Sequence, residues 1–309
     1  MQRRPGRSDL RVIRQLEEIC RKQSPNILHG HGAKGAAYAR LLAPRVGAKA
    51  ICTPHGGSLH FSYSTPRGAA YLALERLLKR RTDGSLFESE FARQAYLHKI
   101  GPATFPSRVV HNGLYDAEFD RLPNHDAQYD FVFVGELRSL KGVHVLVDAL
   151  ARIAQQRNVT LLIVGAGAEE ASIKSRIRDL GVDKQVDFAT PVRPVTEALA
   201  RGRCIVIPSL AESLPYIVLE TIGTGIPLLT TETGGIPEIF GPFADQLLPP
   251  GDAQALADAM LAFLQDPERA YANAERIHDH IKGAFRVSRM VEAVTDFYSE
   301  VLALQKRAS

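Results

Sequence analysis

The sequence predicts an α/β protein with parallel sheets, divided into two domains. Short apolar segments with the character of strands alternate with amphipathic helical segments along the whole chain, which is typical of successive βα units. The length of 309 residues is enough for two domains of ordinary size. Hydrophobic residues make up 45% of the chain and charged residues 23%, the composition of a soluble globular protein.

The first half contains four strand-like and four helical segments in alternation. Ser8 and Asp9 open an amphipathic helix, and later strands end at turn residues such as Gly56-Gly57 and Asn112-Gly113. We expect helices over residues 8–23, 33–44, 67–82 and 90–100, and strands over residues 26–29, 49–54, 84–88 and 107–111.

The composition changes after residue 113. Residues 114–129 are polar and carry a proline and several aspartates, which predicts a domain linker. The expected domains are therefore residues 1–115 and 129–285. The C-terminal segment 286–309, helical over about 288–306, is expected to return to the first domain.

The second half begins with an apolar strand of the kind that is buried on both faces of a sheet. Strands are expected over residues 131–135, 159–164, 186–188, 204–207, 227–230 and 246–248, and helices over residues 143–156, 169–180, 194–201, 253–265 and 268–283.

Two carboxylates, Glu212 and Glu220, flank a predicted helix start. Ser213 is expected to act as the cap and Pro215 to lie in the first turn, where its missing N–H costs nothing. The carboxylates would then stand about 8–10 Å apart along the helix axis, with free N–H groups between them. A diphosphate is stabilised at such a helix start, and the carboxylates can accept hydroxyl hydrogen bonds. This pattern suits a nucleotide sugar.

Basic residues are concentrated in the first half. Residues 1–110 hold 19 Lys and Arg against 7 Asp and Glu, a balance of +12, whereas the remainder holds 19 against 27, a balance of −8. The asymmetry indicates an anionic surface or substrate, with a solvated surface of skewed composition as an equal alternative. Segment 71–81 favours an anionic membrane surface, because its leucines recur at helical spacing beside four cations. The same cations could complement a helix C-terminus.

Other classes of site are not expected. Cys20, Cys52 and Cys204 are far apart and predict reduced core thiols in a cytoplasmic protein. No metal site, bilayer-spanning segment or secretory leader is expected. His29 and His31 are better explained by packing or a turn than by metal ligation.

Several motifs resemble those of glycosyltransferase family 4, the retaining nucleotide-sugar transferases with the GT-B fold of two Rossmann-like domains. The motifs of the second half are Gly135-Glu-Leu-Arg-Ser-Leu-Lys-Gly142, Gly165-Ala-Gly167, Pro208-Ser209, Glu212…Glu220 and Gly234-Gly-Ile-Pro-Glu238. Weaker matches in the first half are His29-Gly-His31-Gly, Thr53-Pro-His55-Gly-Gly, Ser89-Glu-Phe-Ala and Asn112-Gly113.

The chain departs from the family pattern in two places. Glu136 occupies a position where members commonly have arginine, and the nearby arginine is Arg138. The resemblance also implies further β-α units before the segment that begins at residue 8, so the N-terminal domain is expected to be truncated.

The resemblance implies a hexosyltransferase that moves a sugar from a UDP- or GDP-sugar to a glycan or lipid-linked acceptor, without a metal or other cofactor and without a nucleic-acid partner. It places the enzyme in cell-envelope or exopolysaccharide synthesis, and the basic first half would suit an acceptor at the inner face of the plasma membrane. The alternative is an inactive nucleotide-sugar-binding fragment; a phosphorylase or an epimerase is a third reading.

The resemblance also implies roles for individual residues. Arg138 and Lys141 would neutralise the diphosphate, Glu220 would bind the ribose, and Glu212 would bind the donor sugar. His55 would contact the donor sugar or the acceptor, with a turn histidine as an equal alternative. The catalytic candidates are Arg138, Lys141, Glu212 and His55; the donor-binding candidates are Gly135, Gly165, Glu212, Ser213, Leu214, Pro215, Glu220 and Gly235.

Overall fold

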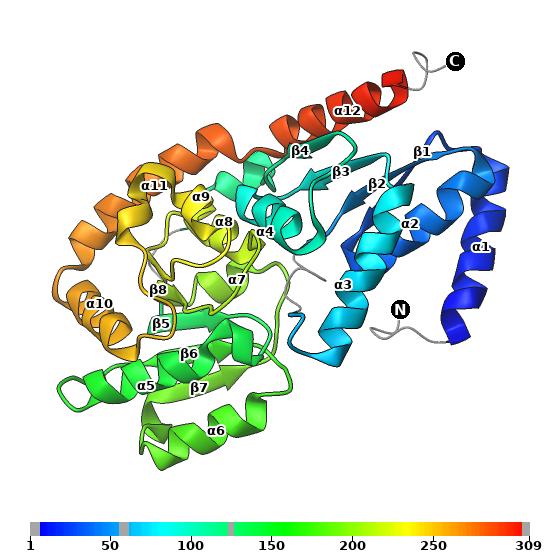
Figure 1. Ribbon diagram of the computed structural model, residues 1–309. Helices are drawn as coiled ribbons and strands as arrows, with labels where there is room; N and C mark the ends of the chain where they lie inside the picture. Colours follow the sequence, from blue (N-terminus) through cyan, green and yellow to red (C-terminus); the bar gives the residue numbers. More distant parts are fainter. Residues whose placement is uncertain (1–6, 56–61, 123–126, 305–309) are drawn as a thin grey trace. The chain divides into compact units, whose positions relative to one another are not determined.

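The computed structural model describes residues 7–55, 62–122 and 127–304. The chain forms two compact units, Met1–His111 with Met290–Ser309 and Asn112–Arg289 (Figure 1). Each unit is built on a parallel sheet, which confirms the predicted fold class. Cys20, Cys52 and Cys204 are buried free thiols. Across the described segments, we find no helix that has the length and apolar character needed to span a bilayer.

The first unit has a four-stranded sheet in the order β1-β2-β3-β4. Its elements are α1 (Arg7–Gln23), β1 (Ile27–His31), α2 (Gly32–Val46), β2 (Lys49–Thr53), α3 (Pro66–Leu78), β3 (Gly84–Phe87), α4 (Glu90–Ile100), β4 (Ser107–Val109) and, from the end of the chain, α12 (Val287–Ala303).

Different helices cover the two faces of the first sheet, because successive strand residues point to opposite sides. Leu86 of β3 packs on one face with Phe297 of α12. The next residue, Phe87, packs on the other face with Tyr96 of α4. The last helix therefore contributes to the core of the first unit.

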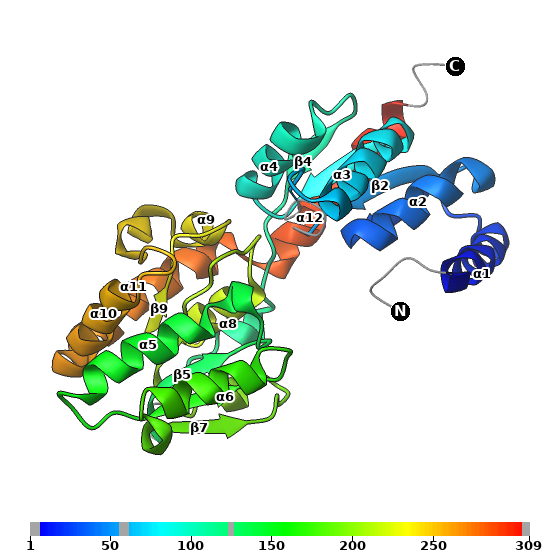
Figure 2. The ribbon, with the colours of Figure 1, turned by 60° about the horizontal axis from the view of Figure 1, so that its bottom comes forward.

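The second unit has a five-stranded sheet in the order β7-β6-β5-β8-β9. Its elements are β5 (Tyr129–Val134), α5 (Val143–Ala154), β6 (Leu161–Val164), α6 (Glu170–Asp179), β7 (Val186–Ala189), α7 (Thr196–Leu199), β8 (Gly202–Ile207), α8 (Tyr216–Gly223), β9 (Leu228–Thr230), α9 (Ile236–Phe240), α10 (Ala253–Gln265) and α11 (Pro267–Ala284). Figure 2 shows the same elements from a second direction.

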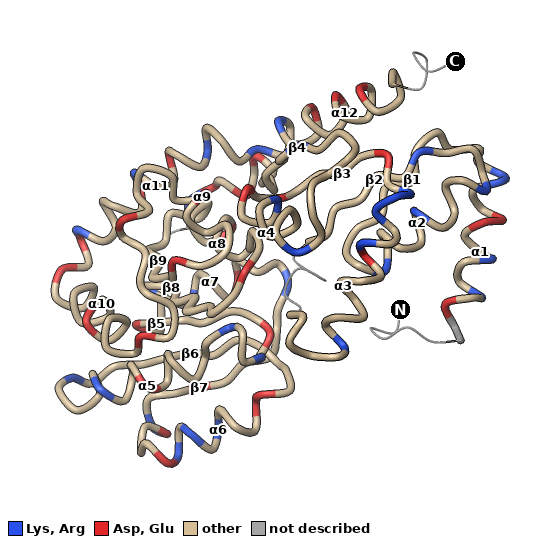
Figure 3. The backbone as a smooth tube through the Cα atoms, viewed as in Figure 1, with Lys and Arg blue, Asp and Glu red and all other residues tan. Residues whose placement is uncertain are grey.

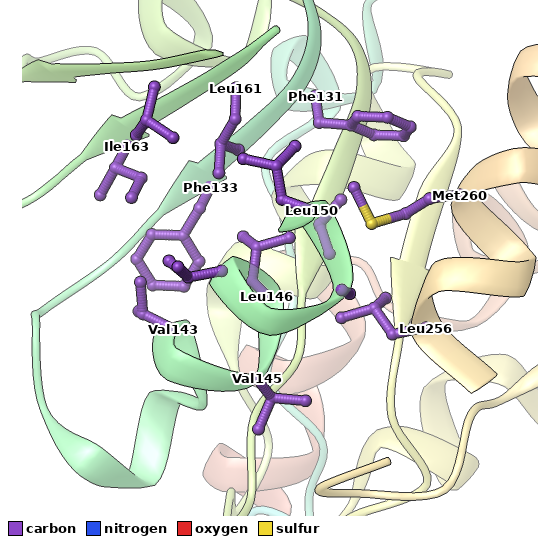
Figure 4. Packing of buried hydrophobic residues seen from close by; sticks show 14 of the residues in the cluster. Phe131, Phe133, Val143, Val145, Leu146, Leu150, Leu161, Ile163, Leu256 and Met260 are labelled. Carbon is purple, nitrogen blue, oxygen red and sulfur yellow. The ribbon is translucent and has the colours of Figure 1, made fainter. Parts of the chain in front are cut away.

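The second sheet is buried on both faces, as its continuous apolar strands predict. Leu146 of α5 lies between side chains of the central strands, such as Phe133, and Met260 of α10 (Figure 4). Val132, the neighbour of Phe133, points to the opposite core, which is built from α7, α8, α9 and α11. Because helices pack on both faces of the sheet, the ends of its strands, where the loops of the candidate site begin, are held in place.

Three expectations differ from the structure. Residues 114–122 were expected in a linker but belong to the second unit, because Leu114 and Phe119 are buried in its core beside α8. The helix expected over residues 194–201 is limited to Thr196–Leu199. The strand expected at residues 246–248 is a single β-bridge between Thr231 and Leu248.

Candidate active site

The strand order of the second sheet creates one position where ligands bind in doubly wound folds. From β5 the chain proceeds to β6 and β7 on one side, then returns to β8 on the other side of β5. The loops that follow β5 and β8 therefore lead away in opposite directions, and doubly wound folds bind ligands in the crevice at the carboxyl ends of such strands. Lys141 and Glu212 lie on these two loops.

Lys141 and Glu212 form an ion pair in this position. Lys141 Nζ lies 2.5 Å from Glu212 Oε1, and both side chains are largely buried, with 20% and 10% exposure. Ser209 Oγ donates to the same Glu212 oxygen at 2.7 Å. The structure thus brings together two of the four catalytic candidates and adds Ser209, whose role the sequence left unassigned.

Backbone contacts hold these loops close together. Leu210 N–H donates to the Leu140 carbonyl at 2.8 Å, which joins the loop after β8 to the loop after β5. Gly234, on the loop after β9, has a φ of +60°, and a Cβ there would lie 2.1 Å from the carbonyl oxygen of Glu212. Only glycine permits this approach, so Gly234 fixes the position of the Glu212 backbone.

Glu220 lies one turn inside α8 and is half-buried. Burial raises the pKa of its carboxyl, and the nearby Glu118 raises it further. Within the described part of the chain, we find no hydrogen bond or ion pair to this carboxylate. A ligand hydroxyl would satisfy a carboxylate that is costly to leave alone. Glu118 was not predicted as a site residue from the sequence, because it lies in the segment that was expected to be a linker.

The start of α8 differs in detail from the expected cap. Pro215, rather than Ser213, occupies the N-cap position, and no side chain caps the helix. The Gly235 amide, expected to face a ligand, donates to the Ser213 carbonyl at 2.6 Å. The buried Asn112 side chain donates to the Leu214 carbonyl at 3.0 Å. Sequence alone marked Asn112 as part of a turn but gave no sign of this partner.

The backbone N–H groups of Gly135 and Gly165 are hydrogen-bonded within the protein, so these glycines shape the loops and do not present free amides to a ligand. Gly135 N–H donates to the Val164 carbonyl and Gly165 N–H to the Ala189 carbonyl, each at 3.1 Å. A Cβ at Gly165 would lie 2.0 Å from the Gly135 carbonyl oxygen, so the two loops touch through their backbones.

Arg138 has a different acidic neighbour from Lys141. Its guanidinium lies 3.6 Å from the Glu136 carboxylate, and both side chains are about two-fifths exposed, at 42% and 40%. Arg138 also lines a cavity of about 440 Å³ between α5 and α6, whose lining includes neither Glu212 nor Glu220. Glu136 is therefore the acidic neighbour of Arg138, whereas Lys141 is paired with Glu212.

The carboxyl edge of the first sheet carries a separate cluster of histidines. His31 Nδ1 lies 2.8 Å from His55 Nε2, and His55 Nδ1 lies 3.9 Å from the buried Glu88 carboxylate. His29 contacts Tyr298 Oη at 2.6 Å and Thr53 Oγ1 at 2.9 Å. Burial, followed by His31 and His55, lowers the pKa of His29 to about 4. The predicted glycines after His55 lie outside the described residues.

Over the described ranges, no group of three or more His, Cys, Asp or Glu side chains has the arrangement needed to hold a metal ion. The contacts of His29 with two hydroxyl groups agree with the structural reading given to it from the sequence.

Two family models match the chain in succession. The glycosyl transferase 4-like domain matches residues 1–113, and the glycosyl transferases group 1 domain matches residues 128–266. The chain belongs to the family 4 glycosyltransferases. Its relatives include a glycogen synthase of Mycobacterium tuberculosis and a lipopolysaccharide core biosynthesis glycosyltransferase. Two relatives illustrate the range of similarity.

N-acetyl-alpha-D-glucosaminyl L-malate synthase of Bacillus anthracis is 24% identical to this glycosyltransferase over 309 residues, covering 95% of the chain and 80% of the relative. The lipopolysaccharide core biosynthesis glycosyltransferase LpsE of Rhizobium meliloti is 32% identical over 172 residues, covering 55% of the chain and 48% of the relative. Among solved structures, HepE of Anabaena in complex with UDP and glucose has a TM-score of 0.84 at 18% identity, with 96% of this chain and 83% of that chain covered. The likeness to HepE shows that the fold is GT-B.

Proposed function

We propose that this glycosyltransferase moves a sugar from a UDP- or GDP-sugar to an acceptor hydroxyl with retention at the anomeric carbon. The observation that carries the proposal is the pairing of Lys141 with Glu212 at the switch point of the second sheet. Glu220, on the adjacent helix, has no hydrogen bond or ion pair among the described residues. The cation and the helix start match the negative charge of the diphosphate, and the two carboxylates match the hydroxyl groups of a nucleotide sugar. The UDP and glucose bound to HepE, which shares the fold, support this choice of ligand.

Each group has a distinct task in the proposed reaction. The bond from the anomeric carbon to the diphosphate breaks, and Lys141 together with the N-terminus of α8 takes up the charge that develops on the leaving oxygen. Glu212 accepts hydrogen bonds from the donor sugar, and Glu220 accepts them from the ribose. The anomeric carbon then bonds to the acceptor oxygen, and the proton of that hydroxyl passes to the departing diphosphate oxygen.

We propose that no metal ion is needed, because a lysine and a helix N-terminus already supply positive charge at the crevice. Turnover measured with an excess of EDTA should equal turnover without it. Loss of activity that Mg²⁺ or Mn²⁺ restores would overturn this part of the proposal.

We further propose that the acceptor is a glycan or lipid-linked molecule at the cytoplasmic face of the plasma membrane. The support is the outer face of α3, where Leu74 and Leu77 are 47% and 63% exposed. Arg76, Arg80 and Arg81 are exposed beside them, and Figure 3 shows the basic residues at the end of this helix. Apolar side chains flanked by cations suit the surface of an anionic bilayer.

Vesicle flotation tests the membrane proposal. The protein should float with phosphatidylglycerol vesicles but not with phosphatidylcholine vesicles, and binding should fall as salt rises. Leu77→Asp should abolish flotation. Leu10→Asp is the matched control, because Leu10 is 65% exposed but lies on α1. If Leu77→Asp floats as well as Leu10→Asp does, α3 is not the element that contacts the membrane.

Turnover separates the enzyme from the alternative, a fragment that binds nucleotide sugars without reaction. A panel of UDP- and GDP-sugars should yield free UDP or GDP by hydrolysis or transfer, and product analysis should show the sugar transferred and not epimerised. Tight UDP or GDP binding by calorimetry, with no release from any donor, would favour the binding fragment.

A further inference from the structure

One peptide group in the loop after β8 is hydrogen-bonded to both neighbouring loops of the second unit. It joins Ser209 to Leu210. Thr231 Oγ1, from the loop after β9, donates to its carbonyl, that of Ser209, at 2.5 Å. Its N–H, that of Leu210, donates to the carbonyl of Leu140 in the loop after β5 at 2.8 Å. The orientation of this peptide is therefore fixed from two sides.

The residues that carry these contacts are shielded from water. Ser209 is 0% exposed and Thr231 is 3% exposed. A buried carbonyl that loses its donor cannot turn to water instead, so the Thr231 hydroxyl is costly to remove. The Ser209 side chain is attached to the fixed peptide, and its staggered rotamers leave few positions for its hydroxyl. Thr231 therefore helps to place the Ser209 hydroxyl.

The Ser209 hydroxyl makes the two oxygens of the Glu212 carboxylate unequal. Glu212 Oε1 accepts hydrogen bonds from Ser209 Oγ at 2.7 Å and from Lys141 Nζ at 2.5 Å. Among the residues that the structure describes, no hydrogen bond reaches Glu212 Oε2. With Oε1 doubly occupied, Oε2 is the oxygen that can accept a hydrogen bond from a ligand.

Ser209 is the donor that would stay on Glu212 when a diphosphate binds. In the proposed reaction the diphosphate shares Lys141, which weakens the contact of the lysine with the carboxylate. The Ser209 hydroxyl carries no charge that a diphosphate could attract, and the residue is fully buried. It would keep Oε1 in place, so Oε2 would keep its direction.

We propose that Ser209 and Thr231 are positioning residues that direct Glu212 Oε2 towards a hydroxyl group of the donor sugar. Thr231 acts through the Ser209 peptide, and Ser209 acts through the other oxygen of the carboxylate. The inference rests on the proposed function, in which Glu212 binds the sugar of a UDP- or GDP-sugar. It adds that recognition of this sugar depends on a chain of hydrogen bonds that starts in the loop after β9.

The adjacent residue, Thr230, provides a matched control. Thr230 Oγ1 donates to the Ile207 carbonyl at 2.8 Å, and Thr230 is 2% exposed. Its hydroxyl satisfies a buried carbonyl as that of Thr231 does, but this carbonyl belongs to β8 and not to the peptide that carries Ser209. Thr230→Val and Thr231→Val should therefore lower Tm alike, so their comparison cancels general destabilisation.

Only variants that release Glu212 should change the recognition of the sugar. Ser209→Ala and Thr231→Val should weaken binding of the donor that the unaltered protein uses, from a panel of UDP-glucose, UDP-N-acetylglucosamine and GDP-mannose. The loss should be about 2- to 10-fold, as expected for one hydrogen bond. Affinity for UDP and GDP, which lack the transferred sugar, should be unchanged. Thr231→Ser keeps the hydroxyl and should restore donor affinity, and Thr230→Val should bind every probe normally.

Crystal structures of the full chain with and without UDP test the geometry itself. With UDP bound, Lys141 Nζ should move towards the diphosphate while Ser209 Oγ stays within hydrogen-bond distance of Glu212. A Glu212 carboxylate that leaves Ser209 and stays with Lys141 would overturn the proposal.

The inference and the proposed function fail in different ways. If the unaltered protein releases no UDP or GDP from any donor, the proposed function is wrong, and the inference falls with it. Normal release, combined with normal donor binding by Ser209→Ala and Thr231→Val, would overturn the inference alone. Equal losses for UDP and for its sugar conjugates would also overturn it, because the two residues would then support the whole site and not the sugar contact.

Discussion

Lys141 Nζ and Glu212 Oε1 are 2.5 Å apart, although 71 positions separate the two residues in the chain. Each residue is the counter-ion of the other in the absence of a ligand. A diphosphate that enters the crevice must share Lys141 with Glu212, and Ser209 then remains as a donor to the carboxylate. In the proposed reaction, binding of the donor would therefore redistribute an existing ion pair instead of attracting an isolated cation.

Lys141→Met should lower turnover by about 10²-fold, with a smaller effect on donor affinity, because the lysine acts mainly on charge that develops as the diphosphate leaves. Single-turnover rates and calorimetry with UDP would separate the two effects. Lys174→Met removes a lysine from an exposed pair with Glu170 on α6 and should change neither quantity. A loss of UDP affinity without a loss of rate would contradict the role given to Lys141.

Glu220→Gln should stabilise the free protein at pH 7 while it weakens nucleotide binding. Burial and Glu118 raise the pKa of Glu220, so its ionised form is disfavoured in the folded state. The neutral Glu220 carboxyl contributes to the stability of the folded state at low pH, and this contribution is lost as pH rises through the raised pKa. A gain on the order of 1 kcal/mol would raise Tm by about 2–4 °C in a unit of this size.

Thermal unfolding at several pH values checks the sign of this effect. The advantage of Glu220→Gln should shrink as pH falls towards the ordinary glutamate range, where the unaltered carboxyl is also neutral. UDP and GDP affinity should drop by about 1–3 kcal/mol, the range for lost hydrogen bonds to a charged group. A variant that is less stable at pH 7, or that binds nucleotide unchanged, would count against a ligand-binding Glu220.

The fold could be predicted from the sequence because each strand and helix shows its own periodicity. The buried strand at β5 and the amphipathic α5 are local patterns, and the alternation of such elements implies parallel sheets. The prediction of a linker was wrong because it also relied on local pattern alone. Residues 114–122 look polar when read locally, whereas Leu114 and Phe119 are buried by contacts with α8 that are distant in sequence.

The site was only partly predictable. Motif order indicated Lys141, Glu212 and Glu220, but it could not distinguish Lys141 from Arg138 as the cation at the crevice, because Glu136 reaches Arg138 only in the folded chain. The positions of Asn112, Ser209 and Glu88 depend on loops that meet in space. Their partners are a backbone carbonyl, a carboxylate and an imidazole from other loops, which no sequence spacing reports.

Asn112→Ala should weaken both stability and nucleotide binding. The variant leaves the Leu214 carbonyl without its buried donor, at a cost of about 1–3 kcal/mol. Because Leu214 directly precedes Pro215, the N-cap of α8, movement of its peptide would change the helix N–H groups offered to a diphosphate. Asn112→Asp tests the donor itself, since a carboxylate of the same shape cannot donate to a carbonyl. Urea unfolding and UDP calorimetry should show both variants impaired, and normal UDP affinity in both would contradict this role.

Gly234→Ala should disturb the donor site more than a glycine substitution that introduces only backbone strain. Gly234 has a φ of +60°, and the added Cβ would lie 2.1 Å from the Glu212 carbonyl oxygen. Gly181 has a φ of +68° with nothing within 4 Å of its Cβ position, so Gly181→Ala is the matched control. The left-handed conformation should cost each variant about 1–2 kcal/mol of folding free energy. Gly234→Ala must also push Glu212 away, so UDP-sugar turnover should fall in this variant alone. Equal stability and equal turnover in the two variants would show that the close contact with Glu212 does not shape the site.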